Sequence, residues 1–200
     1  MKLTTTFKTL RDHGACVSGY RRLAKHLGDI KAYGENKQIN LLTILESNGF
    51  DDCIWSLRAT LEKSDSVKRL IAADFAESAL NIFESKRPGD LRPRQAIQAA
   101  RDFANGKITV EQMATARRAA ADAAADAADA ADAADAADAA DAADAAADAA
   151  DAADAAYAAA YADAADAAYA AASYAAYAAD AAGKKYKDEI LAAILIKHLS

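Results

Sequence analysis

Residues 126–157 form an almost pure repeat of Asp-Ala-Ala, and this tract limits what the chain can fold into. No Lys or Arg occurs in residues 119–182, and neither Gly nor Pro occurs in residues 107–182. Ala has the highest helix propensity of the amino acids, whereas Gly and Pro are the residues that most often end a helix. Residues 107–182 are therefore predicted to be helical.

A three-residue repeat gives a helix no continuous apolar stripe. Successive Asp residues are about 300° apart around an α-helix, so the row of carboxylates drifts by about 60° per repeat and winds round the whole helix. Each Asp repels the Asp three residues away, and a single straight helix of this length would extend over about 100 Å. We therefore expect the tract to fold back, in two or three antiparallel segments, although no turn residue places the bends.

Folding back would bring the acidic tract onto the N-terminal helices, with Ala faces in close contact. The Asp side chains would then face solvent or nearby bases, namely Arg117, Arg118, Lys184 and Lys185. A Tyr ring offers far more area for burial than Ala and adds a hydroxyl group that can bind a polar partner. The predicted packing anchors are therefore the tyrosines of this region, Tyr157, Tyr161, Tyr169, Tyr174 and Tyr177.

Two interpretations of the repeat remain open. In the first, the tract is an expanded Asp-Ala-Ala unit that is tolerated because it lengthens an existing Ala-rich helix. In the second, its carboxylates imitate the phosphates of a nucleic acid. One charge per about 4.5 Å of helix is sparser than one per about 1.7 Å of duplex DNA, so only two or three packed helices would imitate it well. Ice binding is disfavoured because no regular row of Thr is present.

The net charge of −6 conceals a division of the chain into three parts. Residues 1–118 hold 20 Lys and Arg against 14 Asp and Glu, residues 119–182 hold 14 Asp and no base, and residues 183–200 hold four Lys and two acids. This asymmetry predicts a mixed-charge helical part, an acidic Ala/Asp-repeat part and a C-terminal amphipathic helix.

Helix signals recur along the first part, and no segment is a convincing strand. Three predicted helices end at glycines, Gly14, Gly28 and Gly49, where a left-handed residue commonly follows a helix. The first of them begins with Thr caps in "TTTFKTLRDHG", and "FDDCIWSLRA" follows the third as another short helix.

A longer helix is predicted from Ser66 to just before Pro88. Its apolar residues are spaced by three and four and form one face, made of Val67, Leu70, Ile71, Phe75, Ala79, Ile82 and Phe83. Pro93 suits the first position of the next helix, and Thr109 with Gln112 forms a capping box that opens the helix leading into the Ala tract.

Residues that could carry chemistry are few. No phosphate-binding glycine loop or nucleophile elbow is present, so we expect no enzyme and no cofactor. His13 and Cys16 are three residues apart, but the chain has only three His and two Cys, and we interpret His13, Cys16 and Cys53 as helix-end and core residues rather than metal ligands. The two cysteines, the lack of a signal sequence and the lack of a long apolar run predict a cytoplasmic protein without a membrane span.

Arg92 and Arg94 flank Pro93 at a predicted helix N-terminus, where the helix dipole disfavours cations. A negative group should therefore lie nearby. The candidates are Asp90, the glutamates Glu84 and Glu77 on the preceding helix, the Asp tract, or a partner, and we favour an ion pair within the domain over a ligand site.

The segment from Ile71 to Ala120 resembles the immunity proteins of bacterial polymorphic toxin systems, whose relatives also occur in phage genomes. The resemblance centres on "DLRPRQAI" (residues 90–97) and extends more loosely to "LLTILESNGFDDCIWSLRA". In similar proteins the Ala-rich part usually carries scattered Trp, His, Arg or Tyr, so the pure Asp-Ala-Ala run departs from the pattern. The resemblance implies a non-catalytic binding protein and names no target.

The sequence thus predicts an all-α protein with a multi-helical N-terminal part and long Ala-rich helices packed antiparallel. We expect an immunity or antagonist protein that blocks a toxin or host defence protein. The alternatives are an acidic nucleic-acid mimic that occupies a DNA- or RNA-binding protein and a structural or oligomerising helical protein. We expect a protein partner, no direct nucleic-acid binding and no metal, and we leave homo-oligomerisation open. The candidate sites are an anion or partner site at Arg92 and Arg94 and an acidic surface formed by Asp126, Asp129, Asp132, Asp135, Asp138, Asp141 and Asp144.

Overall fold

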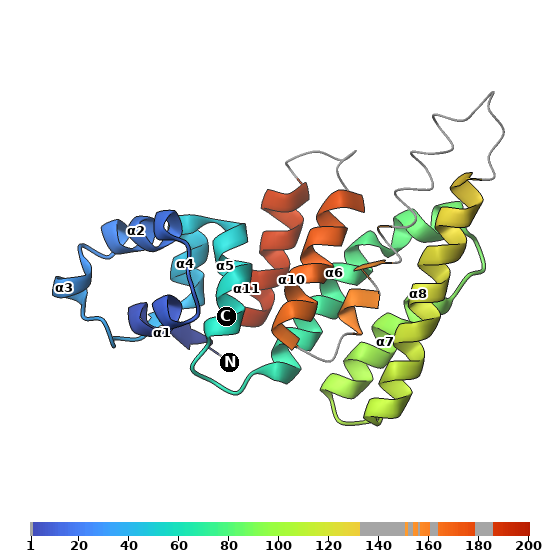
Figure 1. Cartoon of the computed structure of the whole chain (residues 1–200), viewed down its shortest axis with the longest axis horizontal. Helices are drawn as coiled ribbons and strands as arrows, with labels where there is room; N and C mark the ends of the chain where they lie inside the picture. Colours follow the sequence, from blue (N-terminus) through green and yellow to red (C-terminus); the bar gives the residue numbers. More distant parts are fainter. Residues whose placement is uncertain (1, 133–150, 152–153, 156, 161–163, 179–185) are drawn as a thin grey trace. The chain divides into compact units, whose positions relative to one another are not determined.

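The computed structural model describes residues 2–132, 151, 154–155, 157–160, 164–178 and 186–200 (Figure 1). The chain divides into two compact units, the first made of Met1–Ser64 and Asp188–Ser200 and the second of Asp65–Lys187. Helices make up almost all of the regular structure in the described ranges, so the predicted all-α class is confirmed. The charge boundary at residue 118 falls inside a helix of the second unit.

The first unit is a set of short helices held by one small sheet. In chain order it contains β1 (Thr4–Thr5), α1 (Phe7–Asp12), α2 (Val17–His26), α3 (Ile30–Tyr33), β2 (Ile39–Asn40), α4 (Leu41–Asn48), α5 (Phe50–Ser56) and the 3-10 turn η1 (Leu57–Ala59). The chain returns to this unit at its C-terminal end, through the π-helical turn η3 (Tyr186–Leu191) and α11 (Ala192–Leu199). Helix α11 packs against α4, and its Leu195 and Leu199 are buried.

The predicted helix ends of this unit are confirmed. Thr6 caps α1, its hydroxyl accepting a hydrogen bond from the Thr9 N–H at 3.0 Å. Gly49, which ends α4, has a φ of 92°, a left-handed conformation that other residues adopt only with strain.

The expectation that the chain contains no strand is wrong for β1 and β2. These two-residue strands pair antiparallel, with Thr4 opposite Asn40 and Thr5 opposite Ile39. The N–H of Leu61 also donates to the Thr4 carbonyl oxygen at 2.8 Å, so β1 is bonded on both sides. Two residues are too few to show an alternating pattern, and tertiary pairing rather than local sequence forms these strands.

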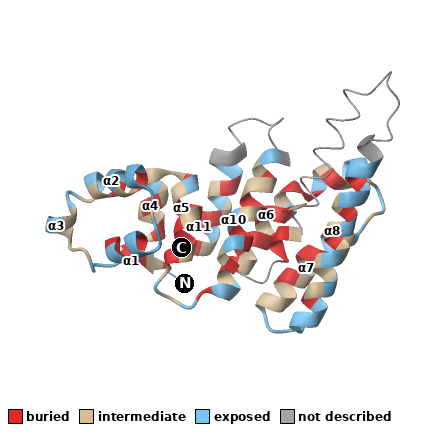
Figure 2. Ribbon diagram, in the orientation of Figure 1, coloured by how far each residue is buried: buried red, intermediate tan, exposed pale blue. Residues whose placement is uncertain are grey.

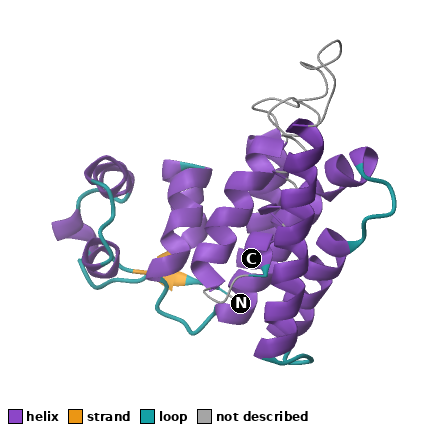
Figure 3. Cartoon of the chain, turned by 45° about the vertical axis from the view of Figure 1, so that its right-hand side comes forward, coloured by secondary structure: helices purple, strands orange, loops and turns teal. Residues whose placement is uncertain are grey.

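The second unit is built on helix α6 (Asp65–Lys86), which packs against both α7 (Arg92–Ala104) and α10 (Ala164–Ala178) (Figures 1 and 3). Helix α8 (Val110–Asp132) packs along α7. The predicted capping box of α8 is confirmed, because the Thr109 N–H donates to the Gln112 side-chain oxygen at 2.8 Å and the Gln112 N–H donates back to the Thr109 hydroxyl at 3.4 Å. Pro93 lies in the first turn of α7, one residue after Arg92 begins it.

Burial of α6 extends beyond the single apolar face that its spacing predicts (Figure 2). Ile71, Phe75, Ala79 and Phe83 are buried as expected, whereas Val67, Leu70 and Ile82 are only half-buried. Further residues off that face are also buried, namely Ala72, Ala73, Ala76 and Leu80. The reason is that neighbours pack on more than one side of α6, and a pattern read from the helix alone cannot include the second contact.

The prediction that the tract folds back onto earlier helices is confirmed for α10, which packs against α6 in the same compact unit. Its buried face consists of alanines, Ala164, Ala167, Ala168, Ala171, Ala172 and Ala175. Small side chains allow two helix backbones to approach closely, so alanines supply the contact.

The prediction that tyrosines anchor the tract is wrong for two of the five. Tyr169 and Tyr177 are 43% and 65% exposed, because they lie on the side of α10 opposite the alanine face. Tyr157 and Tyr174 are half-buried, and the Arg117 guanidinium lies over the Tyr157 ring at 5.8 Å. Tyr161, Lys184 and Lys185 lie outside the described residues.

Candidate binding surface

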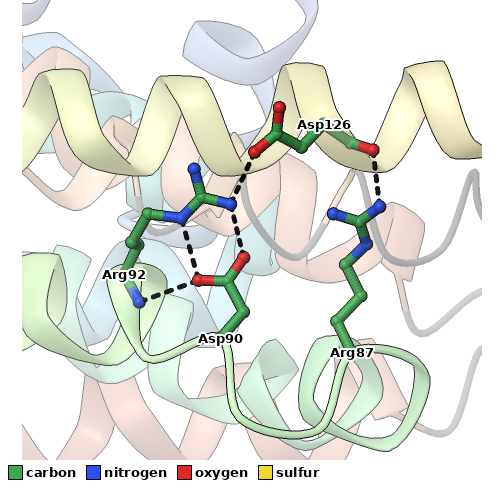
Figure 4. Close-up of polar contacts among 4 residues, drawn as sticks. All are labelled: Arg87, Asp90, Arg92 and Asp126. Atoms are coloured by element: carbon green, nitrogen blue, oxygen red, sulfur yellow. Dashed lines mark hydrogen bonds and ion pairs between the residues drawn. The ribbon is translucent and has the colours of Figure 1, made fainter.

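Arg92 is the centre of a cluster of charged groups that connects α7 to α8 (Figure 4). Its Nε and Nη2 donate to the two carboxylate oxygens of Asp90 at 2.9 and 2.6 Å, and Nη2 also donates to Asp126 Oδ2 at 2.7 Å. The Arg87 Nη2 donates to the backbone carbonyl of the same Asp126 at 2.6 Å. Two guanidinium groups therefore hold one residue of α8, close to the beginning of the Asp-Ala-Ala tract.

The carboxylate of Asp90 lies where a helix N-terminus favours negative charge. Hydrogen bonds from the Arg92 side chain, and also from its backbone N–H, hold the pKa of Asp90 below its ordinary value even though partial burial opposes this. The same pairing raises the pKa of Arg92, first through Asp90 and then through Asp126. Both groups are therefore charged at neutral pH. The negative charge of Asp90 offsets the positive potential at the N-terminus of α7 and the charge of Arg92.

Arg94 lies two residues further along α7, about half a turn around the helix, and has a different partner. Its Nε and Nη2 donate to the two carboxylate oxygens of Glu84 on α6 at 2.8 and 2.7 Å. The Arg94 side chain is 52% exposed, compared with 32% for Arg92. The expected negative neighbours of both arginines are thus present, and they include Asp90, Glu84 and one residue of the Asp tract.

Arg101 and Arg87 carry contacts that the sequence interpretation missed. Arg101 Nη2 contacts Asp74 at 2.8 Å and Glu77 at 2.6 Å. Glu77, which the sequence analysis considered as a partner of Arg92 or Arg94, therefore pairs with Arg101. The i to i+3 spacing of Asp74 and Glu77 shows that they share a face of α6, but nothing in the sequence indicates which arginine reaches it.

The candidate acidic surface is partly described. Asp126 and Asp129 are exposed on α8, and Asp122 joins them on the same side through its four-residue spacing from Asp126. Asp132 is the last residue of α8. The remaining candidates lie outside the described residues, namely Asp135, Asp138, Asp141 and Asp144.

The interpretation of His13, Cys16 and Cys53 as helix-end and core residues is confirmed. His13 follows α1, Cys16 caps α2 with its sulfur accepting from the Gly19 N–H at 3.3 Å, and Cys53 is buried. Burial raises the pKa of the Cys53 thiol to about 12, so this thiol is protonated at neutral pH and is a poor nucleophile. In the part of the chain that the structure describes, no three His, Cys, Asp or Glu residues are grouped as metal ligands.

None of the helices within the described ranges combines the length and apolar character that a membrane crossing requires. The charged groups around α7 form ion pairs with one another, and such pairs help to orient neighbouring helices.

Comparison with known proteins gives one match. No curated protein and no solved structure matches the chain. The model of the Imm-5 like putative immunity protein family matches residues 62–198, which are 137 of the 200 residues. This range includes all of α6, α7, α8 and α10 together with the Arg92 cluster. The chain therefore belongs to the Imm-5 like putative immunity protein family.

Proposed function

We propose that this protein is a non-catalytic immunity or antagonist factor, which binds a toxin or a host defence protein inside the cell and blocks it sterically. The observation that carries the proposal is the family match over residues 62–198, because it covers the second unit completely. A toxin partner is what the family description implies. The link to polymorphic toxin systems or to phage rests on the resemblance of residues 71–120.

The chemistry of the second unit supports binding rather than catalysis. Its arginines at α7 are paired with carboxylates of the same unit, and such pairs fix the relative positions of α6, α7 and α8. A scaffold that is fixed in this way presents its outer surface without large rearrangement, which lowers the entropic cost of binding a partner.

An acidic nucleic-acid mimic is the competing proposal, and the exposed Asp122, Asp126 and Asp129 on one side of α8 favour it. Two features weigh against it. The Asp126 carboxylate is shared with Arg92, which reduces its negative field, and a single row of Asp is sparser than duplex phosphates. We therefore place it second.

Affinity purification of the full-length, tagged protein from its native host, with mass spectrometry of the bound proteins, tests the proposal. A captured toxin should then arrest growth when expressed alone and should be neutralised by co-expression of the wild-type protein. Ala171→Pro, which should break α10 in its middle, is the matched variant that should fail to neutralise.

Other captured proteins would contradict the proposal in distinct ways. Recovery of a general DNA-binding protein, released by competing duplex DNA, would favour the nucleic-acid mimic. Recovery of the protein alone, with self-association seen by analytical ultracentrifugation, would favour a structural or oligomerising role.

A further inference from the structure

Helix α2 has an inner face that is held in place by α4 and α5. Gly19 and Leu23 on this face are buried. The side-chain nitrogen of Asn48 donates to the Gly19 carbonyl oxygen and to Asp52 Oδ2, each at 2.8 Å. Gly19 leaves no room for a side chain, because an added Cβ would lie 2.6 Å from Asp52 Oδ2. A close backbone contact and two hydrogen bonds therefore set the position of α2 within the first unit.

The outer face of α2 is basic and exposed (Figure 2). Arg21 and Lys25 are four residues apart, so they lie next to each other on the side of the helix opposite Leu23. Ser18 and Arg22 flank them, and all four outer residues are exposed. The helix contains no acidic residue. This face therefore gathers three cations on a helix of 10 residues, which is about 15 Å long.

These cations lack the carboxylate partners that arginines have elsewhere in the molecule. The three arginines of α7 each contact a carboxylate. Within the described ranges, by contrast, the side chains of Arg21 and Lys25 make no ion pair or hydrogen bond, and Arg22 donates to the carbonyl oxygen of the last residue of α4 at 3.0 Å. The first acid after α2, Asp29, accepts from the N–H two residues later at 2.8 Å. Arg21 and Lys25 therefore add little to the stability of the fold, and their charge faces solvent.

The size of this face and the charge of the whole chain select the kind of partner that it fits. A protein that grips a nucleic acid through its backbone typically neutralises about 6–10 phosphates, and the net charge of −6 on this chain repels a long polyanion. Three cations within about 15 Å match instead a small cluster of Asp and Glu on a protein surface. The guanidinium group of arginine fits a carboxylate with two parallel hydrogen bonds, and lysine adds a point charge.

We infer that the outer face of α2, defined by Ser18, Arg21, Arg22 and Lys25, binds a cluster of carboxylates on the surface of the protein partner. This inference rests on the proposed function and gives the partner a chemistry. Helix α2 precedes the family match, which begins at residue 62, so the family assignment does not account for this face. Because the inner face of α2 is held by Asn48 and Asp52, the helix loses little freedom when the partner binds.

A titration of the isotope-labelled, full-length protein with a decaglutamate peptide, followed by the nuclear magnetic resonance shifts of backbone amides, tests this inference. We expect the shift changes to concentrate at residues 18–26. The variant Arg21→Gln/Lys25→Gln should bind the peptide about fivefold more weakly, since two charged contacts are lost. The control Lys2→Gln/Lys63→Gln removes the same charge from exposed positions of the same unit and should bind within about twofold of wild type. All three proteins should melt at the same temperature, because the substituted side chains are exposed.

Three results would overturn the inference. They are shift changes that are absent from α2, equal loss of binding in the α2 variant and the control, and a duplex DNA of matched charge that shifts the α2 amides more strongly than the peptide, which would identify a nucleic-acid surface. The proposed function is tested apart from this. A toxin that is captured equally by wild type and Arg21→Gln/Lys25→Gln would leave the function standing and reject the face. Failure to capture any toxin would count against the function, and the titration would still decide the face.

Discussion

Arg92 occupies the first residue of α7, where unpaired backbone N–H groups make the local potential positive. A cation at this position destabilises a helix unless an anion is close. Asp90 supplies that anion from the preceding loop, and Asp126 supplies a second one from α8. The residue that looks unfavourable on its own helix therefore connects two helices of the second unit.

We predict that Arg92→Ala lowers the free energy of unfolding of the second unit by about 1 kcal/mol, because Asp90 is only 15% exposed and loses a two-pronged partner. Arg94→Ala is the matched comparison on the same helix turn, and it should have a smaller effect because the Arg94 side chain is more exposed. Chemical denaturation followed by far-ultraviolet circular dichroism measures both. An unchanged stability of Arg92→Ala, combined with loss of partner binding, would instead make Arg92 part of a binding site.

The ion pair of Arg92 with Asp90 should also make the free energy of unfolding depend on pH in the acid range. The pKa of Asp90 is lower in the folded chain than its ordinary value of about 3.9, so the Arg92 contact stabilises the fold fully above that pH and the contribution is lost as the pH falls through the folded value. The stability difference between wild type and Arg92→Ala should therefore be largest near neutral pH and should shrink in acid. A difference that stays constant down to about pH 2 would show that Arg92 acts through packing instead.

At the scale of the element, α10 shows how an Ala-rich helix packs against a neighbouring helix. Its alanines give it little area to bury per residue, but they allow close contact with α6, whose own buried alanines Ala72, Ala76 and Ala79 offer a similar surface. Tyr169 and Tyr177, which would fill more space, are turned outward, and Tyr174 is half-buried. Close approach of small side chains, rather than insertion of large ones, holds this helix.

We predict that Ala171→Leu destabilises the second unit by about 1–3 kcal/mol, because Ala171 is fully buried and three extra carbons cannot fit without moving α10. The neighbouring Ala170→Leu is the matched control. Ala170 is half-buried toward the outer side, and Leu has nearly the same helix propensity at both positions. The melting temperatures of the two variants are compared, and Ala171→Leu should have the lower one. Equal melting temperatures would show that the alanine face does not require small residues.

At the scale of the whole molecule, the first unit is completed by the two ends of the chain. Helix α11, which begins more than 130 residues after η1 ends, packs against α4 and buries Leu195 and Leu199. The family match begins at residue 62 and ends at residue 198, so it joins the second unit to this returning helix. The core of the first unit is thus completed by residues from the C-terminal end of the sequence.

Leu195→Ala should destabilise the first unit by about 2–5 kcal/mol, because it removes a fully buried side chain that faces this core. Trp55 on α5 is the only tryptophan of the chain and reports on this unit, so its fluorescence should show unfolding at a lower denaturant concentration. Ile196→Ala, at the adjacent 48% exposed position, is the control and should leave the transition unchanged. Equal shifts for the two variants would mean that α11 is not an integral part of this core.

Local signals in the sequence predict most of the elements. Thr6, Gly49 and the pair Thr109 with Gln112 mark helix ends as expected, because a cap is a contact between residues two to four positions apart. The all-α class follows from these ends and from the high helix propensity of the Ala tract. Arg92 could likewise be identified as a residue in need of an anion, since its position beside Pro93 is visible without any structure.

Tertiary structure alone decides which partners meet. Nothing local indicates that Arg92 shares Asp126, that Arg101 takes Glu77, or that β1 pairs with β2 across more than 30 residues. The outward direction of Tyr169 and Tyr177 is decided in the same way, because it depends on which side of α10 the alanines of α6 accept. The physical reason is that caps and propensities act over a few residues, whereas ion pairs and packed faces are selected by the competition of all segments for the same limited contacts.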